Sequence, residues 1–155
     1  MSDDVRLIPV GAADRAAVLA LTLGDDQHEL VASNTESLEE ADDDPLARPR
    51  AIVDGERVVG FLMYEAPEDE TWANVYRFMI DHRAQGRGYG RAALARLLDE
   101  IRALPWVEEV EICYMPENDG ARRLYASAGF VEIGTDEDGE IIARLDLGRR
   151  AGGRS

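Results

Sequence analysis

The stretch of sequence that decides the fold is "HRAQGRGYGRAAL", residues His82–Leu94. A strand-like run, "WANVYRFMID" (Trp72–Asp81), precedes it. After it, Arg91–Leu104 carries leucine and isoleucine at helical spacing, which predicts a long helix. Glycine has no Cβ, so the main-chain N–H groups here can approach a ligand closely. The helix start adds unpaired N–H groups and the positive end of the helix dipole, and three arginines add charge. The stretch therefore predicts an anion site suited to phosphate or pyrophosphate.

A dinucleotide site is an alternative reading of the same glycines. "GYGRAA" (Gly88–Ala93) loosely fits the pattern G-x-G-x-x-G/A. In dinucleotide-binding domains that motif follows the first strand, and further strand–helix units come after it. Here only about one such unit follows, which is too little for a full dinucleotide crevice. A nucleotide-binding protein stays a competing hypothesis, and a turn that binds nothing is a third.

Strands and helices are predicted on both sides of this stretch. Upstream, "PRAIVDGERVVGFLMYEA" (Pro49–Ala66) has two apolar runs around Asp54-Gly55, which is a strong hairpin signal. The run at Trp72–Asp81 would add a third strand to that hairpin. The other expected elements are strands at Val5–Val10 and Val107–Met115, helices at Ala12–Leu23, Ser33–Pro45 and Asn118–Phe130, and a final hairpin of Val131–Thr135 and Ile141–Leu147.

This order of elements predicts an α/β (mixed α+β) domain built on a mixed sheet of about six to seven strands with about four helices. The connection from Met79 through the long helix to Val110 should be a parallel, right-handed crossover. A length of 155 residues suits one domain. We expect that domain to span residues 1–148, with a disordered tail over residues 149–155.

The charge of the chain bears on its partners. The net charge is −15 at pH 7, and all 17 basic residues are arginine. Nucleic acid and anionic membranes are therefore poor partners, whereas an amine or polycation is a better one. The alternative is that the acidity reflects solubility or a salt-rich habitat. The absence of lysine excludes a P-loop lysine, a Schiff-base lysine and a lysine general base.

Cysteine and histidine usage bears on compartment and metals. The single cysteine, Cys113, cannot form an internal disulfide, and "MSDDVRLIPV" lacks the layout of a secretory signal. No apolar run is long enough to span a membrane. We therefore expect a cytoplasmic protein. His28 and His82 do not have metal-site spacing, so no metal is expected.

Two motifs resemble a known family. Gln85-Gly-Arg-Gly-Tyr-Gly90 fits the Gln/Arg-x-x-Gly-x-Gly/Ala signature of the GNAT superfamily of N-acetyltransferases. Asn118–Phe130 resembles that superfamily's "N…A…LY…GF" helix. The resemblance extends in element order from Val5 to about Leu147. It implies a twisted sheet that splays between the strands before and after the long helix.

A narrower resemblance is to bacterial diamine and spermine/spermidine acetyltransferases. The segments that carry it are "VASNTESLEEA" (Val31–Ala41), "GFLMY" (Gly60–Tyr64), "RFMID" (Arg77–Asp81) and "YMPEN" (Tyr114–Asn118).

The resemblance implies acetyl-CoA as co-substrate and direct transfer of the acetyl group to a primary amine. The strand before the glycines would pair with the pantetheine arm, and the amides of the glycine stretch would hold the pyrophosphate. The residues implied to bind the cofactor are Phe78, Met79, Ile80, Gln85, Gly86, Arg87, Gly88, Tyr89, Gly90, Arg91 and Asn118.

Tyr125 matches the family's general acid, which would protonate the departing thiolate. The alternative is a core tyrosine on an apolar helix stripe. Some polyamine acetyltransferases carry a glutamate where this chain has Tyr76, so that role does not carry over. Glu65 is the first substitute as general base, with Glu29 and Glu36 behind it, and the alternative for each is a solvated surface carboxylate.

The expected acceptor is a small amine with more than one positive charge, with spermine or spermidine first. Glu29, Asn34, Glu36 and Tyr64 are expected to contact it, and Glu40 and Glu65 add nearby carboxylates. Alternatives are an acyl-CoA-binding regulatory module without turnover, or an acetyltransferase acting on a peptide or protein amine or an aminoglycoside. By family analogy alone, the protein is expected to form a homodimer.

Overall fold

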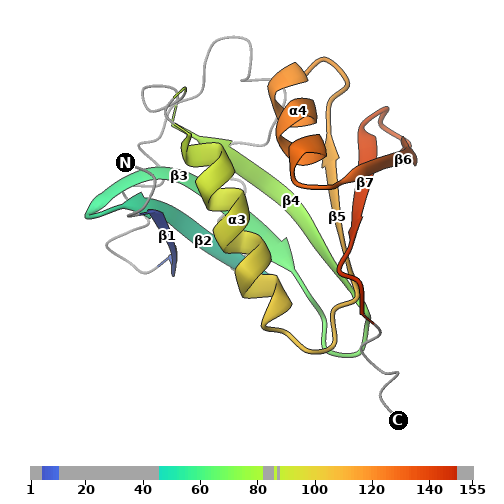
Figure 1. Ribbon diagram of the computed structural model, residues 1–155, viewed down its shortest axis with the longest axis horizontal. Helices are drawn as coiled ribbons and strands as arrows, with labels where there is room; N and C mark the ends of the chain where they lie inside the picture. The colour runs from blue at the N-terminus through green and yellow to red at the C-terminus, as the bar shows by residue number, and fades with distance from the viewer. Residues whose placement is uncertain (1–4, 11–45, 82–85, 87, 150–155) are drawn as a thin grey trace.

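The computed structural model describes residues 5–10, 46–81, 86 and 88–149, and shows one seven-stranded mixed sheet (Figure 1). The strands lie in the order β1-β2-β3-β4-β5-β7-β6. This architecture confirms the predicted fold class. The expected helices at residues 12–23 and 33–45 lie outside the described residues. The elements are β1 (Val5–Pro9), β2 (Ala47–Asp54), β3 (Arg57–Glu65), β4 (Trp72–Ile80), α3 (Tyr89–Arg102), β5 (Glu109–Tyr114), α4 (Asp119–Ser127), β6 (Val131–Thr135) and β7 (Ile141–Asp146).

The antiparallel half of the sheet follows from its turn chemistry. Asp54 pairs with Arg57 around a turn in which Gly55 has a φ of 63°. Only glycine adopts that left-handed conformation without a steric cost, so the Asp-Gly pair fixes the hairpin of β2 and β3. β4 then pairs antiparallel with β3, as the sequence predicts.

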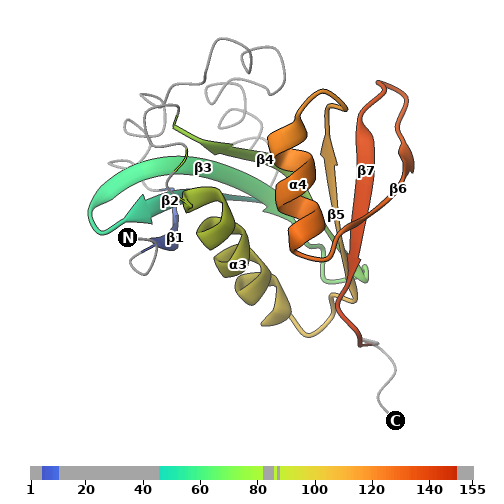
Figure 2. The ribbon, with the colours of Figure 1, turned by 45° about the horizontal axis from the view of Figure 1, so that its top comes forward.

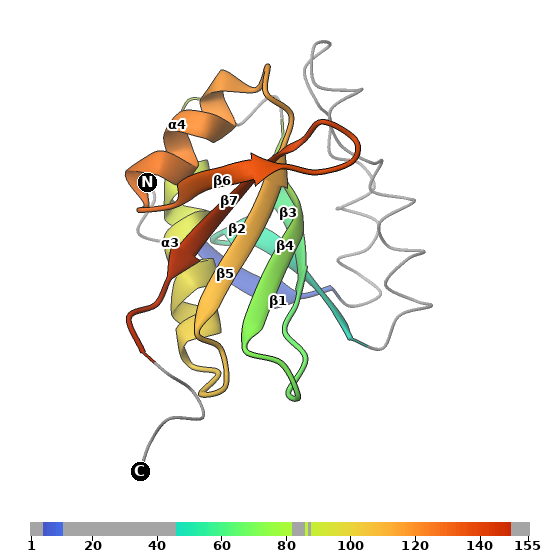
Figure 3. The ribbon, with the colours of Figure 1, turned by 90° about the vertical axis from the view of Figure 1, so that its right-hand side faces the viewer.

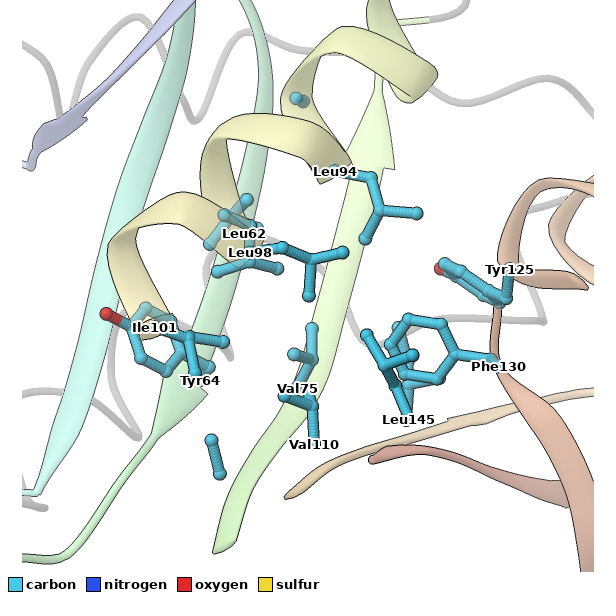
Figure 4. Packing of buried hydrophobic residues seen from close by; sticks show 14 of the residues in the cluster. Leu62, Tyr64, Val75, Leu94, Leu98, Ile101, Val110, Tyr125, Phe130 and Leu145 are labelled. Carbon is cyan, nitrogen blue, oxygen red and sulfur yellow. The ribbon is translucent and has the colours of Figure 1, made fainter. Parts of the chain in front are cut away.

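Helices α3 and α4 lie on the same face of the sheet, here called the front face (Figure 2). Both present apolar side chains to it at helical spacing, and Leu97 and Ile101 of α3 are fully buried. Figure 4 shows Leu94, Leu98 and Ile101 packed over the sheet beside Tyr125 and Phe130. A second apolar cluster lies on the other face, here called the back face, and consists of Ala51, Val53, Phe61, Met63 and Met79.

The sheet splits at its centre. β4 pairs with β5 in parallel only from Trp72 to Val75, opposite Glu109 to Ile112. The register of β3 and β4 shifts at the same level, so that Tyr76 is an extra residue in β4. Such a bulge bends a strand and increases its twist. Beyond it, the carboxyl ends of β4 and β5 diverge, which confirms the predicted splay (Figures 1 and 2). We call this divergence the fork.

Gly60 sits where β3 meets the far end of β4, and its lack of a side chain is required there. A Cβ at Gly60 would lie 2.5 Å from the main-chain oxygen of Met79. We therefore expect Gly60→Ala to push the two strands apart and lower the free energy of unfolding by about 1–3 kcal/mol. Gly134→Ala is the matched control, because a Cβ there meets nothing within 4 Å. Urea titration of both variants checks this, and equal midpoints would contradict it.

The carboxyl end of the described chain is anchored. Arg149, the first residue of the predicted tail, donates hydrogen bonds to the main-chain oxygens of Arg102, Leu104 and Val107. It thereby satisfies carbonyl groups at and just beyond the end of α3, where a cation also interacts favourably with the helix dipole. Residues 150–155 lie outside the described residues. None of the helices in the described ranges has the length and apolarity needed to cross a membrane.

Candidate functional site

The glycine turn forms the start of α3. Gly86 and Gly88 both have φ values of 82°, and a Cβ at either would meet nothing within 4 Å. Gly88 is the N-cap of α3, where no side chain caps the helix and no acidic residue occupies the first turn. Open space beside bare main chain at a helix N-terminus fits a phosphate group. Gln85 and Arg87, the other predicted contacts in this turn, lie outside the described residues.

The next three predicted contacts divide into two kinds. The Tyr89 side chain is buried, and its hydroxyl donates a hydrogen bond to Asp54 in the β2–β3 turn. A Cβ at Gly90 would lie 3.5 Å from Leu124, so glycine allows close approach of α3 and α4 here. Arg91 is exposed. Tyr89 and Gly90 could therefore contact a cofactor only through main chain, whereas Arg91 has a side chain to offer.

The far end of β4 lies at the fork. Phe78 is half-buried on the front face, and its ring meets that of Tyr125 edge-on with centroids 6.2 Å apart. Met79 packs into the back-face cluster, and Ile80 packs against the front-face core. The structure therefore brings two predicted residues together, Phe78 from the cofactor set and Tyr125 from the catalytic set.

Tyr125 projects from α4 into a group of aromatic rings. It is 5% exposed, and the rings of Tyr114 and Phe130 lie 5.3 and 5.9 Å from its own. Figure 4 shows its hydroxyl directed away from α4, toward α3 and β4. Within the described part of the chain, that hydroxyl has no hydrogen-bond partner. Burial, and to a lesser extent Tyr114, raises the pKa of Tyr125 well above its usual value. The phenol is therefore neutral at physiological pH and still holds the proton that a general acid must donate.

A polar clamp supports this ring group, and the sequence alone did not predict it. The Tyr114 hydroxyl donates to Glu132 at 3.0 Å, and Arg122 binds both oxygens of Glu132 at 2.8 and 3.0 Å. Burial, followed by the Glu132 hydrogen bond, raises the pKa of Tyr114 to about 12. The clamp joins β5, α4 and β6. No local sequence pattern predicts this clamp, because Tyr114 and Glu132 are 18 residues apart in the chain.

Asn118 caps α4. Its side-chain oxygen accepts the N–H of Ala121 at 3.1 Å, and its own N–H bonds to the Met115 oxygen. This is the usual role of asparagine at a helix start. The cap fixes the side chain. Its NH₂ group can still donate hydrogen bonds to a ligand beside the β5–α4 junction.

Of the residues predicted for the acceptor side, the structure describes Tyr64 and Glu65, and neither lies in the ring group around Tyr125. The Tyr64 side chain is fully buried between β3 and α3, and its hydroxyl donates to Glu100. A side chain in that position packs the sheet against the helix and presents no surface to a substrate. Glu65 pairs with Ala47 and so lies on the back face, opposite to Tyr125. Glu29, Asn34 and Glu36 lie outside the described residues.

The back face of the second half of the sheet carries charge. Arg144 of β7 lies 3.1 Å from Glu109 and 2.7 Å from Glu111 of β5. Cys113 follows on the same face, and burial, followed by nearby carboxylates, raises its pKa to about 11. The thiol therefore stays protonated. In the described ranges, no three histidine, cysteine or acidic side chains are arranged to hold a metal ion.

Comparison with known proteins gives consistent likenesses. The model of the acetyltransferase (GNAT) family matches residues 18–130. The spermine/spermidine N(1)-acetyltransferase of Bacillus subtilis (strain 168) is 32% identical over 141 residues, covering 86% of this chain and 93% of the relative.

Two solved structures share the fold. The ribosomal-protein-S18-alanine N-acetyltransferase from Escherichia coli has a TM-score of 0.75 at 19% identity, covering 97% of this chain and 99% of that one. The spermidine N-acetyltransferase from Vibrio cholerae, in complex with CoA and spermine, has a TM-score of 0.73 at 19% identity, covering 92% and 94%. Both likenesses extend over nearly the whole chain.

Proposed function

Because this chain is an N-acetyltransferase that belongs to the acetyltransferase (GNAT) family, we propose that it uses acetyl-CoA to acetylate a primary amine of a small molecule, with a polyamine as the favoured acceptor. The observation that carries the cofactor assignment is the glycine turn. There, two left-handed glycines with open space beside them begin a helix without a side-chain cap. That arrangement suits the pyrophosphate of CoA.

The pantetheine arm would lie in the fork. The main chain of Phe78, Met79 and Ile80 follows the bulge at Tyr76, where β4 turns away from β5. An extended ligand placed along β4 would take the position of a missing strand. Asn118, at the β5–α4 junction, would contact it from the other side. The residues proposed to hold the pyrophosphate are Gln85, Gly86, Arg87, Gly88, Tyr89, Gly90 and Arg91.

Tyr125 is proposed as the general acid. Its phenol stands beside Phe78, at the fork where the thioester would lie. When the amine attacks the acetyl carbon, the bond to sulfur breaks and the sulfur takes the electron pair. A neutral phenol next to the sulfur can then supply a proton. Glu65, on the back face, remains the carboxylate that the sequence proposes as base.

A polyamine is supported as acceptor by the charge of the chain and by the name of its relative. The net charge of −15 attracts polycations. The Bacillus subtilis relative is a spermine/spermidine N(1)-acetyltransferase. The direct test is acetyl transfer to a panel of polyamines, amino acids, aminoglycosides and peptide N-termini. If no amine in the panel is acetylated, the proposal is wrong.

Salt should separate a polyamine acceptor from a generic amine. Exposed charges are screened beyond about 8 Å at physiological ionic strength. We therefore expect kcat/KM for spermidine to fall more steeply with added NaCl than kcat/KM for a singly charged amine. Steady-state rates with both amines at low and high salt measure this. Parallel slopes would mean that the second charge of the acceptor is not recognised.

A further inference from the structure

The fork has a back face as well as a front face, and the β6–β7 turn reaches that back face. Figure 3 shows this turn on the side of the sheet away from α3 and α4, at the end where β4 and β5 diverge. Ile141, Ala143 and Leu145 of β7 belong to the front-face core. By strand alternation, Glu140 then projects to the back, as does Cys113 of β5, whose neighbours Ile112 and Tyr114 belong to the same core.

The position of Glu140 is fixed by its main chain. Its N–H donates to the Asp136 side chain at 2.9 Å, and its oxygen accepts the Asp136 N–H at 2.9 Å. Asp136 also accepts the N–H of Asp138 at 2.9 Å, which orders the turn. The Glu140 carboxylate itself has no hydrogen-bond partner among the residues that the structure describes, although it is partly buried. A carboxylate whose main chain is held in place, and which binds no described residue, can accept a proton from a ligand within hydrogen-bond reach.

Charged and polar groups from both sides of the fork interact electrostatically with this carboxylate. Arg77 of β4 interacts with it across the fork, and Arg77 is itself folded back over the Tyr76 ring at 5.5 Å. Cys113 of β5, and Asp136 and Asp138 of the turn itself, also interact with it electrostatically. Glu140 therefore interacts electrostatically with residues of β4 and of β5, the two strands that would flank the acetyl group.

Building on the proposed function, we propose that Glu140 is the general base, which takes a proton from the acceptor amine at the back face of the fork while Tyr125 serves the sulfur from the front face. Glu65 lies on the same back face but beside Ala47 and Asn74, at the closed end of β4. Asn74 is four positions before Phe78, about 13 Å along the strand. Glu140 stands at the open end.

An amine arrives as an ammonium with three N–H bonds and leaves as an amide with one. Glu140 takes the first proton, which frees the nitrogen lone pair to bond to the acetyl carbon. The carbon–sulfur bond breaks, and the Tyr125 proton goes to the sulfur. The second amine proton restores the Tyr125 phenol, and Glu140 later releases its proton to solvent.

The acid–base chemistry of the surroundings supports this role. Burial, followed by the Asp136 and Asp138 charges, raises the pKa of Glu140, and Arg77 opposes that rise. A carboxyl with a raised pKa binds a proton more strongly than an ordinary glutamate. It serves as base only when ionised, so activity should fall as the pH drops through its pKa.

The test is the pH profile of Glu140→Gln. With Glu140 present, kcat/KM should reach a plateau above the carboxyl pKa, because the enzyme removes the amine proton itself. Without it, only free amine reacts, and the free fraction of an amine with a pKa of about 10.4 rises about tenfold per pH unit. We expect kcat/KM to fall about 100-fold at pH 7. It should then climb with a slope of about one in log units through neutral pH.

The acceptor for this test is the amine with the highest kcat/KM in the panel, expected to be spermidine. Glu140→Asp should keep the plateau at a lower rate, and Glu137→Gln, in the same turn, should match the parent. Acetyl-CoA affinity should be unchanged in all three variants. The assignment would be wrong if Glu140→Gln kept the parental pH profile or changed KM alone. It would also be wrong if Glu65→Gln showed the sloping profile instead. An inactive parent would reject the proposed function itself.

Discussion

Replacing Gly88 with valine should lower the affinity for CoA at least about 100-fold, equivalent to about 2.8 kcal/mol, in a protein that remains folded. Two effects combine. A branched side chain would fill the open space beside the turn, where the pyrophosphate is proposed to lie. Valine also resists the left-handed conformation that Gly88 adopts at a φ of 82°, so the turn would change shape. Calorimetric titration with CoA measures the loss.

Gly148→Val separates the two effects. Gly148 has a φ of 76°, and a Cβ there also meets nothing within 4 Å, but it follows β7 instead of preceding α3. The same backbone strain should lower the melting temperature to a similar extent without changing CoA affinity. Undiminished CoA binding in Gly88→Val would remove the glycine turn from the cofactor site.

Replacing Tyr125 with phenylalanine should lower kcat by about 10²–10³-fold while acetyl-CoA affinity changes little. The ring contacts with Phe78, Tyr114 and Phe130 would remain, because only the hydroxyl is removed. That hydroxyl has no hydrogen bond to any described residue, so stability should be preserved. A rate within about twofold of the parent would show that another group protonates the thiolate, or that the thiolate leaves unaided.

The pH dependence of this loss is a second expectation. Because the folded environment raises the pKa of Tyr125, the phenol stays protonated across the physiological range. The ratio of parental to Tyr125→Phe rates should therefore be constant between about pH 6 and pH 9. Tyr114→Phe is the matched control. It removes a hydroxyl from the neighbouring ring but leaves the Tyr125 proton in place, so its rate should stay far closer to the parent's.

Local signals in the sequence were sufficient for much of the fold. Asp54-Gly55 predicts the turn between β2 and β3, and Gly55 adopts the conformation that the turn requires. The long helix was predicted at Arg91–Leu104 and is observed at Tyr89–Arg102. Its start was misplaced because Gly90, a poor helix former, is tolerated where α3 approaches Leu124. That contact between two helices leaves no local trace in the sequence.

The site was less predictable, because the face on which a side chain lies depends on distant partners. Tyr64 was predicted to contact the substrate from a family resemblance, but the run "GFLMYE" does not indicate which side of β3 meets a helix. Its partner, Glu100, stands 36 residues away on α3. Glu140 was missed for a related reason. Alternation within β7 places it opposite the core, but only the insertion of β7 between β5 and β6 brings it to the fork.

The fork also affects the stability of the protein against unfolding and proteolysis. Four register positions, from Trp72 to Val75, join β4 to β5, so β1–β4 and β5–β7 are two smaller sheets hinged at one end. A ligand lying along β4 would contact both smaller sheets and hold them together. Any ligand that binds only the native state stabilises it, by about 2.7 kcal/mol at 100 times its Kd. Resistance of the protein to proteolysis would then increase with the concentration of acetyl-CoA. The protein would be degraded faster when acetyl-CoA is scarce.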